Sequence, residues 1–154
     1  MRKSQLAKPA AAARVLLVDD NQDGLMARKS LLEEQGLEIT TKTNGEDAFE
    51  ALSQAGFDLL VTDFKMPKMN GVELIRRAKA LQPTLPIILL SGFVDTLGLD
   101  ERSTGADVVI AKGNHEVSHL LRSTTRLLAR KSPRKPPGSQ GAARSKIKPK
   151  GRSS

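Results

Sequence analysis

The chain has 154 residues and a formal net charge of +8, with 25 basic and 17 acidic side chains. It has no cysteine, which excludes disulfides and thiolate metal sites, and its two histidines are too few for a histidine-rich metal centre. No apolar run approaches the roughly 20 residues of a membrane span, so we expect a cytoplasmic protein with one hydrophobic core.

The positive charge is concentrated at the C-terminal end. Residues 131–154 hold eight Lys and Arg, no acidic residue and a single large aliphatic residue, Ile147, whereas residues 15–130 hold 13 basic and 17 acidic side chains. Such segments have too few apolar groups to offset the entropy of ordering. We therefore predict a disordered arm over 1–13, a folded domain over 14–130 and a disordered basic tail over 131–154.

Short apolar runs alternate with segments of helical spacing along the central part of the chain. Apolar runs without polar alternation are typical of strands buried on both faces of a parallel sheet. In chain order, the sequence predicts a strand at 15–18, a helix ended by Gly36, a strand at 37–41, a helix ended by Gly56, a strand at 59–61, a helix around 72–78, a strand at 87–90, a weak helix over 94–104, a strand at 108–111 and a helix over 117–128 with Asn114 as N-cap.

The alternation of five strands with five helices, joined by short loops, predicts the fold class. It is typical of a flavodoxin-like, doubly wound α/β sandwich with a five-stranded parallel sheet. The segment 94–104 is expected to be the least stable helix, because it contains Gly98 and several Ser and Thr residues.

Polar side chains follow four of the predicted strands, at the edge where doubly wound sheets bind their ligands. They are Asp19 and Asp20 after the first strand, Asp63 after the third, Ser91 after the fourth and Lys112 after the fifth. Three carboxylates packed together repel one another unless a cation lies between them. A hard dication that prefers oxygen ligands, such as Mg²⁺, is therefore expected here.

Each of these residues also has an ordinary explanation. Asp19 and Asp20 could belong to a loop that caps the first helix, and Ser91 could belong to a turn. Lys112 could be a solvated lysine at the surface. The joint order of an acidic pair, an acid, a hydroxyl and a lysine at successive strand ends favours one shared site over these separate explanations.

The motifs in these positions are VLLVDDN, LLVTDFKMPKMNG, LLSG and GADVVIAKG, and they extend over roughly residues 14–130. They resemble the motifs of response-regulator receiver domains of two-component signalling. The resemblance implies that Asp63 is the phosphoacceptor, and that Asp19, Asp20, Asp63 and the backbone carbonyl of Lys65 hold Mg²⁺.

The resemblance also assigns the remaining polar residues and the partners. Ser91 and Lys112 would bind phosphoryl oxygens, and Ser91 would act as the switch that moves the weak helix after the fourth strand. The phosphoryl donor would be a histidine kinase or a phosphotransfer protein. Because the sequence predicts no folded output domain, we expect a stand-alone signalling domain rather than an enzyme, acting through phosphorylation-dependent contact with another protein.

Two positions depart from the family pattern. Val109 stands where an aromatic switch residue is usual, and Gly113 stands where a proline usually follows the lysine. A cis bond before a residue other than proline costs about 3 kcal/mol, so we expect a trans bond between Lys112 and Gly113, with the lysine somewhat displaced. Phe93 and Lys65 are expected to flank the pocket and to alter the lifetime of the phosphoryl group.

Two other functions remain as alternatives. Val109 and Gly113 suit a degenerate receiver that works as a phosphorylation-independent adaptor, in which the tail over 131–154 binds nucleic acid non-specifically through its charge. A phosphatase with an aspartyl phosphate would have a second Asp two residues after the nucleophile, where this chain has Lys65.

Overall fold

The computed structural model describes residues 12–131. The predicted arm over 1–13 and the predicted tail over 131–154 therefore lie almost entirely outside the described residues.

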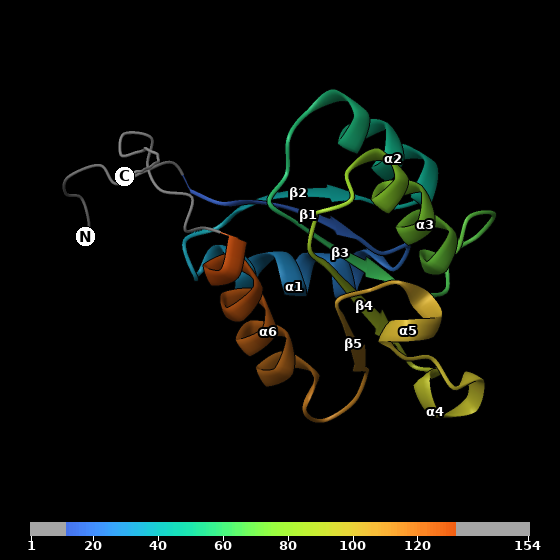
Figure 1. Ribbon diagram of the computed structural model, residues 1–154. Coiled ribbons are helices and arrows are strands. Elements are labelled where there is room, and N and C mark those ends of the chain that lie inside the picture. Colours follow the sequence, from blue (N-terminus) through green and yellow to red (C-terminus); the bar gives the residue numbers. More distant parts are fainter. Residues whose placement is uncertain (1–11, 132–154) are drawn as a thin grey trace, which may run out of the picture.

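Five strands form one parallel sheet in the order β2-β1-β3-β4-β5 (Figure 1). The strands are β1 (Arg14–Val18), β2 (Glu38–Lys42), β3 (Leu59–Asp63), β4 (Ile87–Ser91) and β5 (Val108–Ala111). The five predicted strands are confirmed, with ends that differ by at most two residues. The doubly wound fold class is confirmed as well, because each parallel pairing is reached through a helical crossover.

The helices within the described residues are α1 (Gln22–Glu33), α2 (Gly45–Gln54), α3 (Gly71–Leu81), α4 (Val94–Leu97), α5 (Glu101–Thr104) and α6 (Glu116–Lys131). The weak helix predicted over 94–104 is divided into α4 and α5. Gly98 ends α4 in a left-handed conformation with φ 66°, and Asp100 starts α5 by accepting a hydrogen bond from the N–H of Ser103. The glycine that lowers helix propensity here is thus also the point of interruption.

Asn114 is not the N-cap of the last helix, contrary to the prediction. A turn closed by a hydrogen bond from the N–H of Glu116 to the carbonyl of Gly113 occupies this position. The carbonyl of His115 then accepts the first helical bond, from the N–H of His119. The helix consequently begins at Glu116, one residue later than an Asn114 cap requires.

Helices cover both faces of the sheet, α1 and α6 on one face and α2 and α3 on the other (Figure 1). Because successive side chains of a strand point to opposite faces, alternate residues of each strand enter different cores. Leu16 and Val18 of β1 pack with the α2 and α3 side, whereas Val15 and Leu17 pack with α1 and α6. This double burial explains the continuous apolar runs of β1, β3, β4 and β5, whereas the edge strand β2 is only half-buried and has no such run.

The strand order reverses between β1 and β3, since β1 connects outward to β2 and β3 leads on to β4 and β5. Doubly wound sheets bind ligands at the carboxyl ends of the strands beside such a reversal. The residues that follow β1 and end β3 are Asp19, Asp20 and Asp63. The topology therefore brings the three predicted carboxylates to one edge.

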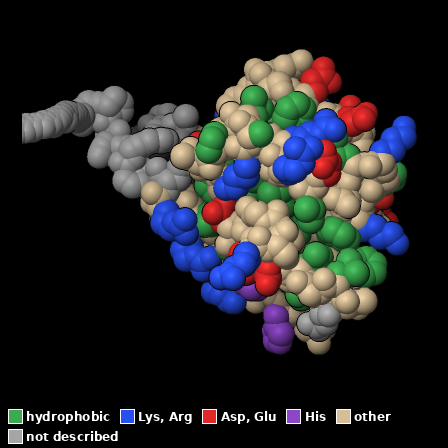
Figure 2. All heavy atoms as spheres, turned by 45° about the vertical axis from the view of Figure 1, so that its right-hand side comes forward, with side chains coloured by type: hydrophobic (Ala, Val, Ile, Leu, Met, Phe, Trp, Pro, Cys, Tyr) green, Lys and Arg blue, Asp and Glu red, His purple; other side chains and the backbone are tan. Residues whose placement is uncertain are grey.

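The surface mixes both signs of charge. Figure 2 shows acidic and basic side chains interspersed over much of one face, with Lys and Arg gathered toward one side of it. No helix among residues 12–131 is both long enough and apolar enough to cross a membrane.

Candidate functional site

The loop after β1 separates a capping residue from two carboxylates. Asn21 caps α1, because its side chain accepts a hydrogen bond from the N–H of Gly24 at 2.8 Å. Asp19 is buried, and its Oδ1 accepts a bond from the N–H of Asn21 at 2.9 Å. Asp20 is exposed. The capping explanation thus applies to Asn21 and leaves the two carboxylates for another role.

Asp63 ends β3 with its side chain only 8% exposed, and Gly71 lies close to the backbone that carries it. The N–H of Gly71 donates to the carbonyl of Phe64 at 2.7 Å. A Cβ on Gly71 would collide with the carbonyl oxygen of Asp63 and lie 2.9 Å from Cδ1 of Leu89. A glycine is therefore required where α3 starts against the loop that carries Asp63.

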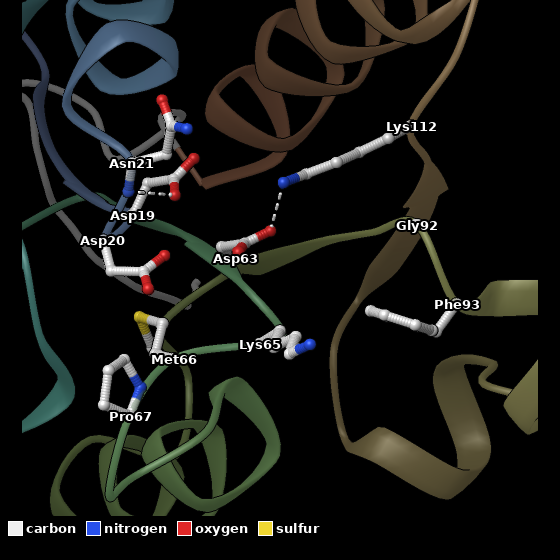
Figure 3. A pocket seen from close by; sticks show the side chains of 10 residues that line it. All are labelled: Asp19, Asp20, Asn21, Asp63, Lys65, Met66, Pro67, Gly92, Phe93 and Lys112. Atoms are coloured by element: carbon white, nitrogen blue, oxygen red, sulfur yellow. Dashed lines mark hydrogen bonds and ion pairs between the residues drawn. The ribbon is translucent and has the colours of Figure 1, made fainter.

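Lys112 reaches the same point from the end of β5. Its Nζ lies 2.6 Å from Oδ1 of Asp63, and its backbone N–H donates to the carbonyl of Ser91 at 3.0 Å. The peptide bond to Gly113 is trans, as expected, and the ammonium of Lys112 contacts Asp63 with this trans bond in place. Figure 3 shows Lys112 approaching Asp63 from the side opposite to Asp19 and Asp20.

Asp19, Asp20, Asp63 and Lys112 line one open pocket of about 500 Å³. One oxygen from each of Asp19, Asp20 and Asp63 lies within 4.8 Å of the others, so a single small ion can contact all three. Carboxylate oxygens are the ligands that Mg²⁺ prefers, and the exposed side of the pocket leaves room for the waters that it retains. The donor set therefore fits Mg²⁺.

Lys65, Met66 and Pro67 form another part of the pocket wall, across from Phe93 (Figure 3). The ammonium of Lys65 lies 5.5 Å from the centre of the Phe93 ring, a cation–π arrangement. Lys65 and Phe93 thus flank the pocket, in the places expected for them.

The pKa of Asp63 is raised above its ordinary value. Burial of the carboxyl is the largest cause, and the hydrogen bond and charge of Lys112 only partly oppose it. The charge of Asp19 raises the pKa further, and that of Arg28 lowers it. The pocket therefore stabilises the ionised carboxyl poorly, and a nearby dication would favour it.

Ser91 lies behind the pocket rather than in its wall. It is 1% exposed, and its Oγ accepts a hydrogen bond from the N–H of Phe93 at 2.8 Å. The described residues that line the pocket include Gly92 and Phe93 but not Ser91. The structure thus brings Asp19, Asp20, Asp63, Lys65 and Lys112 together, with Ser91 one step removed.

Val109, at the switch position, is half-buried against the α2 and α3 core. Its backbone N–H lies on the free edge of β5 and donates to the Glu101 carboxylate at 2.9 Å. This bond ties α5 to the edge strand. It does not depend on an aromatic side chain at position 109.

Two charged residues outside the pocket lining, Arg28 and Glu116, pair with Asp19 directly or through each other and were not singled out from the sequence. Arg28 of α1 donates from Nη1 to Oδ2 of Asp19 at 2.7 Å and from Nε to Oε2 of Glu116 at 2.6 Å. One signal was available: Arg28 shares a helix face with the buried Leu25 and Leu32, since it follows the first by three residues and precedes the second by four. A charge at such a position is a candidate for a buried ion pair.

Comparison with known proteins agrees with this geometry. The sequence model of the response regulator receiver domain matches residues 15–122. The chain belongs to this family. Receiver domains are signalling domains of two-component phosphorelays, in which they interact with histidine kinases or phosphotransfer proteins. The predicted family and the predicted fold are both confirmed.

Individual relatives are similar to half of this chain or more. The response regulator receiver protein CpdR of Brucella abortus is 41% identical over 80 residues, which cover 52% of this chain and 67% of CpdR. The gliding motility regulatory protein of Myxococcus xanthus is 33% identical over 127 residues, which cover 79% of this chain but 16% of that longer protein.

The response regulator TrrA of Thermotoga maritima, solved in complex with Mg²⁺ and BeF, superposes with a TM-score of 0.66 and 30% identity. That match covers 75% of this chain and 98% of TrrA.

Proposed function

We propose that Asp63 accepts a phosphoryl group and that the receiver domain extends over residues 14–130. One observation carries the proposal: the carboxylate of Asp63 lies beside two other carboxylates, within 4.8 Å, and 2.6 Å from the ammonium of Lys112. A nucleophile, a place for a dication and a fixed cation thus meet at one point. Phosphoryl transfer depends on this combination of positioning and charge neutralisation.

Asp19, Asp20, Asp63 and the backbone carbonyl of Lys65 are the proposed Mg²⁺ ligands. The acidic cluster supports this assignment, as does the structure of TrrA, which was solved with Mg²⁺ and BeF. When bound, the ion supplies positive charge to the oxygens of the incoming phosphoryl group.

The reaction is a displacement at phosphorus. An oxygen of the Asp63 carboxylate forms a bond to phosphorus while the bond to the imidazole nitrogen of the phosphohistidine donor breaks, and the imidazole keeps the electron pair. The product on this chain is an acyl phosphate. Lys112, released from the carboxylate oxygen that carries the phosphorus, pairs with a phosphoryl oxygen. Attack of water on that phosphorus later returns Asp63 and inorganic phosphate.

Ser91 is the proposed switch. Its Oγ accepts a bond from Phe93, and a hydroxyl that accepts one bond can still donate its own hydrogen. Donation to a phosphoryl oxygen requires the end of β4 to move toward the pocket. The segment 91–104 is suited to move, since it contains only the two short helices α4 and α5.

The alternative is a receiver that works as a phosphorylation-independent adaptor. Val109 at the switch position favours it. The intact set of Asp19, Asp20, Asp63 and Lys112 around one pocket favours phosphoryl transfer. Failure of wild type to gain a phosphoryl group would instead support the adaptor function.

Intact-mass analysis tests the proposal. Wild type incubated with acetyl phosphate or phosphoramidate and Mg²⁺ should gain one phosphoryl group and should gain none when Mg²⁺ is chelated. Asp63→Asn should stay unlabelled, whereas Asp23→Asn, which removes an exposed acid in the first turn of α1, should be labelled like wild type. Equal labelling of wild type and Asp63→Asn would refute the assignment.

A further inference from the structure

Arg28 is a partly buried cation whose ion pairs connect Asp19 of the pocket with α6. Its side chain is 12% exposed and lies between α1 and α6, which pack on the same face of the sheet (Figure 1). One edge of the guanidinium pairs with Asp19, whose side chain is 3% exposed. The other edge pairs with Glu116 in the first turn of α6, and the side chain of Glu116 is 14% exposed.

This pair of bonds differs from an ordinary surface ion pair. Burial of a guanidinium is costly unless its charge and donors are matched, and Arg28 is matched by two carboxylates at 2.6 and 2.7 Å. A Cβ at Gly24 would lie 3.1 Å from Nη1 of Arg28 and 3.5 Å from Oδ2 of Asp19, so a side chain there would crowd the guanidinium.

Both oxygens of Asp19 already have partners within the chain. Oδ1 accepts from the N–H of Asn21, and Oδ2 accepts from Arg28. A dication that uses Asp19 must share this carboxylate with a fixed positive charge, and the two cations repel each other.

We propose that Arg28 is a positioning residue that competes with Mg²⁺ for Asp19 and, through Glu116, links occupation of the pocket to the first turn of α6. The inference rests on the proposed metal site. When the dication draws on Asp19, the guanidinium shifts its pairing toward Glu116. A change in the charge of the pocket thereby alters the ion pair of Glu116 in α6, and Val109 takes no part in this coupling.

The proposal predicts opposite effects for the two partners of one bridge. Arg28→Leu keeps an apolar stem and removes the competitor, so Mg²⁺ should bind about three- to tenfold more tightly. Glu116→Gln removes the second partner and leaves Arg28 to Asp19 alone, so Mg²⁺ should bind about two- to threefold more weakly.

A double-mutant cycle separates this coupling from a general effect of charge. If Glu116 acts through Arg28, then Glu116→Gln should have almost no effect on Mg²⁺ affinity in the Arg28→Leu background. Lys29→Gln is the matched control, because it removes the neighbouring positive charge of α1, which pairs with Glu33 at 2.8 Å. It should leave the affinity within about 1.5-fold of wild type.

The experiment is a calorimetric Mg²⁺ titration of wild type, the two single variants, the double variant and Lys29→Gln, together with the NMR signal of the Arg28 Nε–H in wild type. The Nε–H signal should move with the same midpoint as the calorimetric titration. The proposal would be overturned if folded Arg28→Leu bound Mg²⁺ as weakly as wild type or more weakly. It would also be overturned if Glu116→Gln changed the Mg²⁺ affinity equally in both backgrounds, or if the Nε–H signal did not move during the titration.

If Arg28→Leu does not fold, Glu116→Gln and the Nε–H signal decide the matter. The Mg²⁺ affinities and the Nε–H signal are measured without a phosphodonor. They therefore test this inference whether or not Asp63 accepts a phosphoryl group. A wild type that binds no Mg²⁺ would refute the proposed metal site together with this inference.

Discussion

The ammonium of Lys112 lies 2.6 Å from Oδ1 of Asp63, yet the pKa of Asp63 remains above its ordinary value because burial of the carboxyl outweighs the lysine. An ionised Asp63 is therefore unfavourable for folding when no dication is bound. The residue that carries the proposed chemistry thus lowers the stability of the metal-free protein.

Asp63→Asn should consequently raise the melting temperature of the metal-free protein at pH 7 by a few degrees, because it removes the carboxylate whose ionisation is unfavourable in the folded protein. Because the folded pKa is raised, the wild type regains this stability as the pH falls through the folded pKa toward the ordinary 3.8. The advantage of the variant should shrink over the same range, and saturating Mg²⁺ should reverse it. Calorimetric melting checks this, and a lower melting temperature of the variant at pH 7 without metal would contradict it.

Asp20→Asn should weaken Mg²⁺ binding by about tenfold or more, because it removes a charged oxygen ligand from the cluster. Asp23→Asn removes an exposed acid three residues further along and should bind Mg²⁺ like wild type. A calorimetric titration measures both. Equal affinity in the two variants would show that the metal site lies elsewhere.

Gly71→Ala should destabilise the fold by about 1–3 kcal/mol and slow phosphoryl labelling, since its Cβ must displace the backbone of Asp63 or the side chain of Leu89. Gly56→Ala places its Cβ where no other atom lies within 4 Å, and it serves as the control. Urea unfolding and labelling rates test the pair. If both variants behave alike, Gly71 does not position Asp63.

Lys112→Ala and Ser91→Ala should still accept the phosphoryl group, although more slowly, because each keeps the nucleophile and loses one partner of the phosphoryl oxygens. The amide spectra of residues 91–104 should then change much less on phosphorylation than in wild type. A full spectral change in either variant would exclude that residue from the switch.

The strand ends of the site were predictable because β1, β3, β4 and β5 each contain a continuous apolar run of three or four residues that leads directly into polar residues. The convergence of Asp19, Asp63 and Lys112 follows from the parallel topology alone. The withdrawal of Ser91 behind Gly92 and Phe93 was not predictable, because it depends on a local bond between Oγ and a backbone N–H.

The bridge through Arg28 escaped prediction for another reason. Helical spacing places residue 28 on the inner face of α1, but its partner Glu116 is 88 residues away and becomes a neighbour only when α1 and α6 pack together. Long-range pairing of this kind leaves no periodic signal in a single sequence. The start of α6 was likewise missed by one residue, because the turn at Gly113 takes the place of the Asn114 cap.

The most direct test of the central claim is to locate the modification. Wild type labelled with acetyl phosphate and Mg²⁺ is treated with borohydride, which reduces an aspartyl phosphate to homoserine and leaves free carboxylates unchanged, and its peptides are sequenced by mass spectrometry. The account predicts homoserine at position 63 and unchanged aspartate at positions 19 and 20. Homoserine at another position, or none at position 63 in labelled protein, would contradict it.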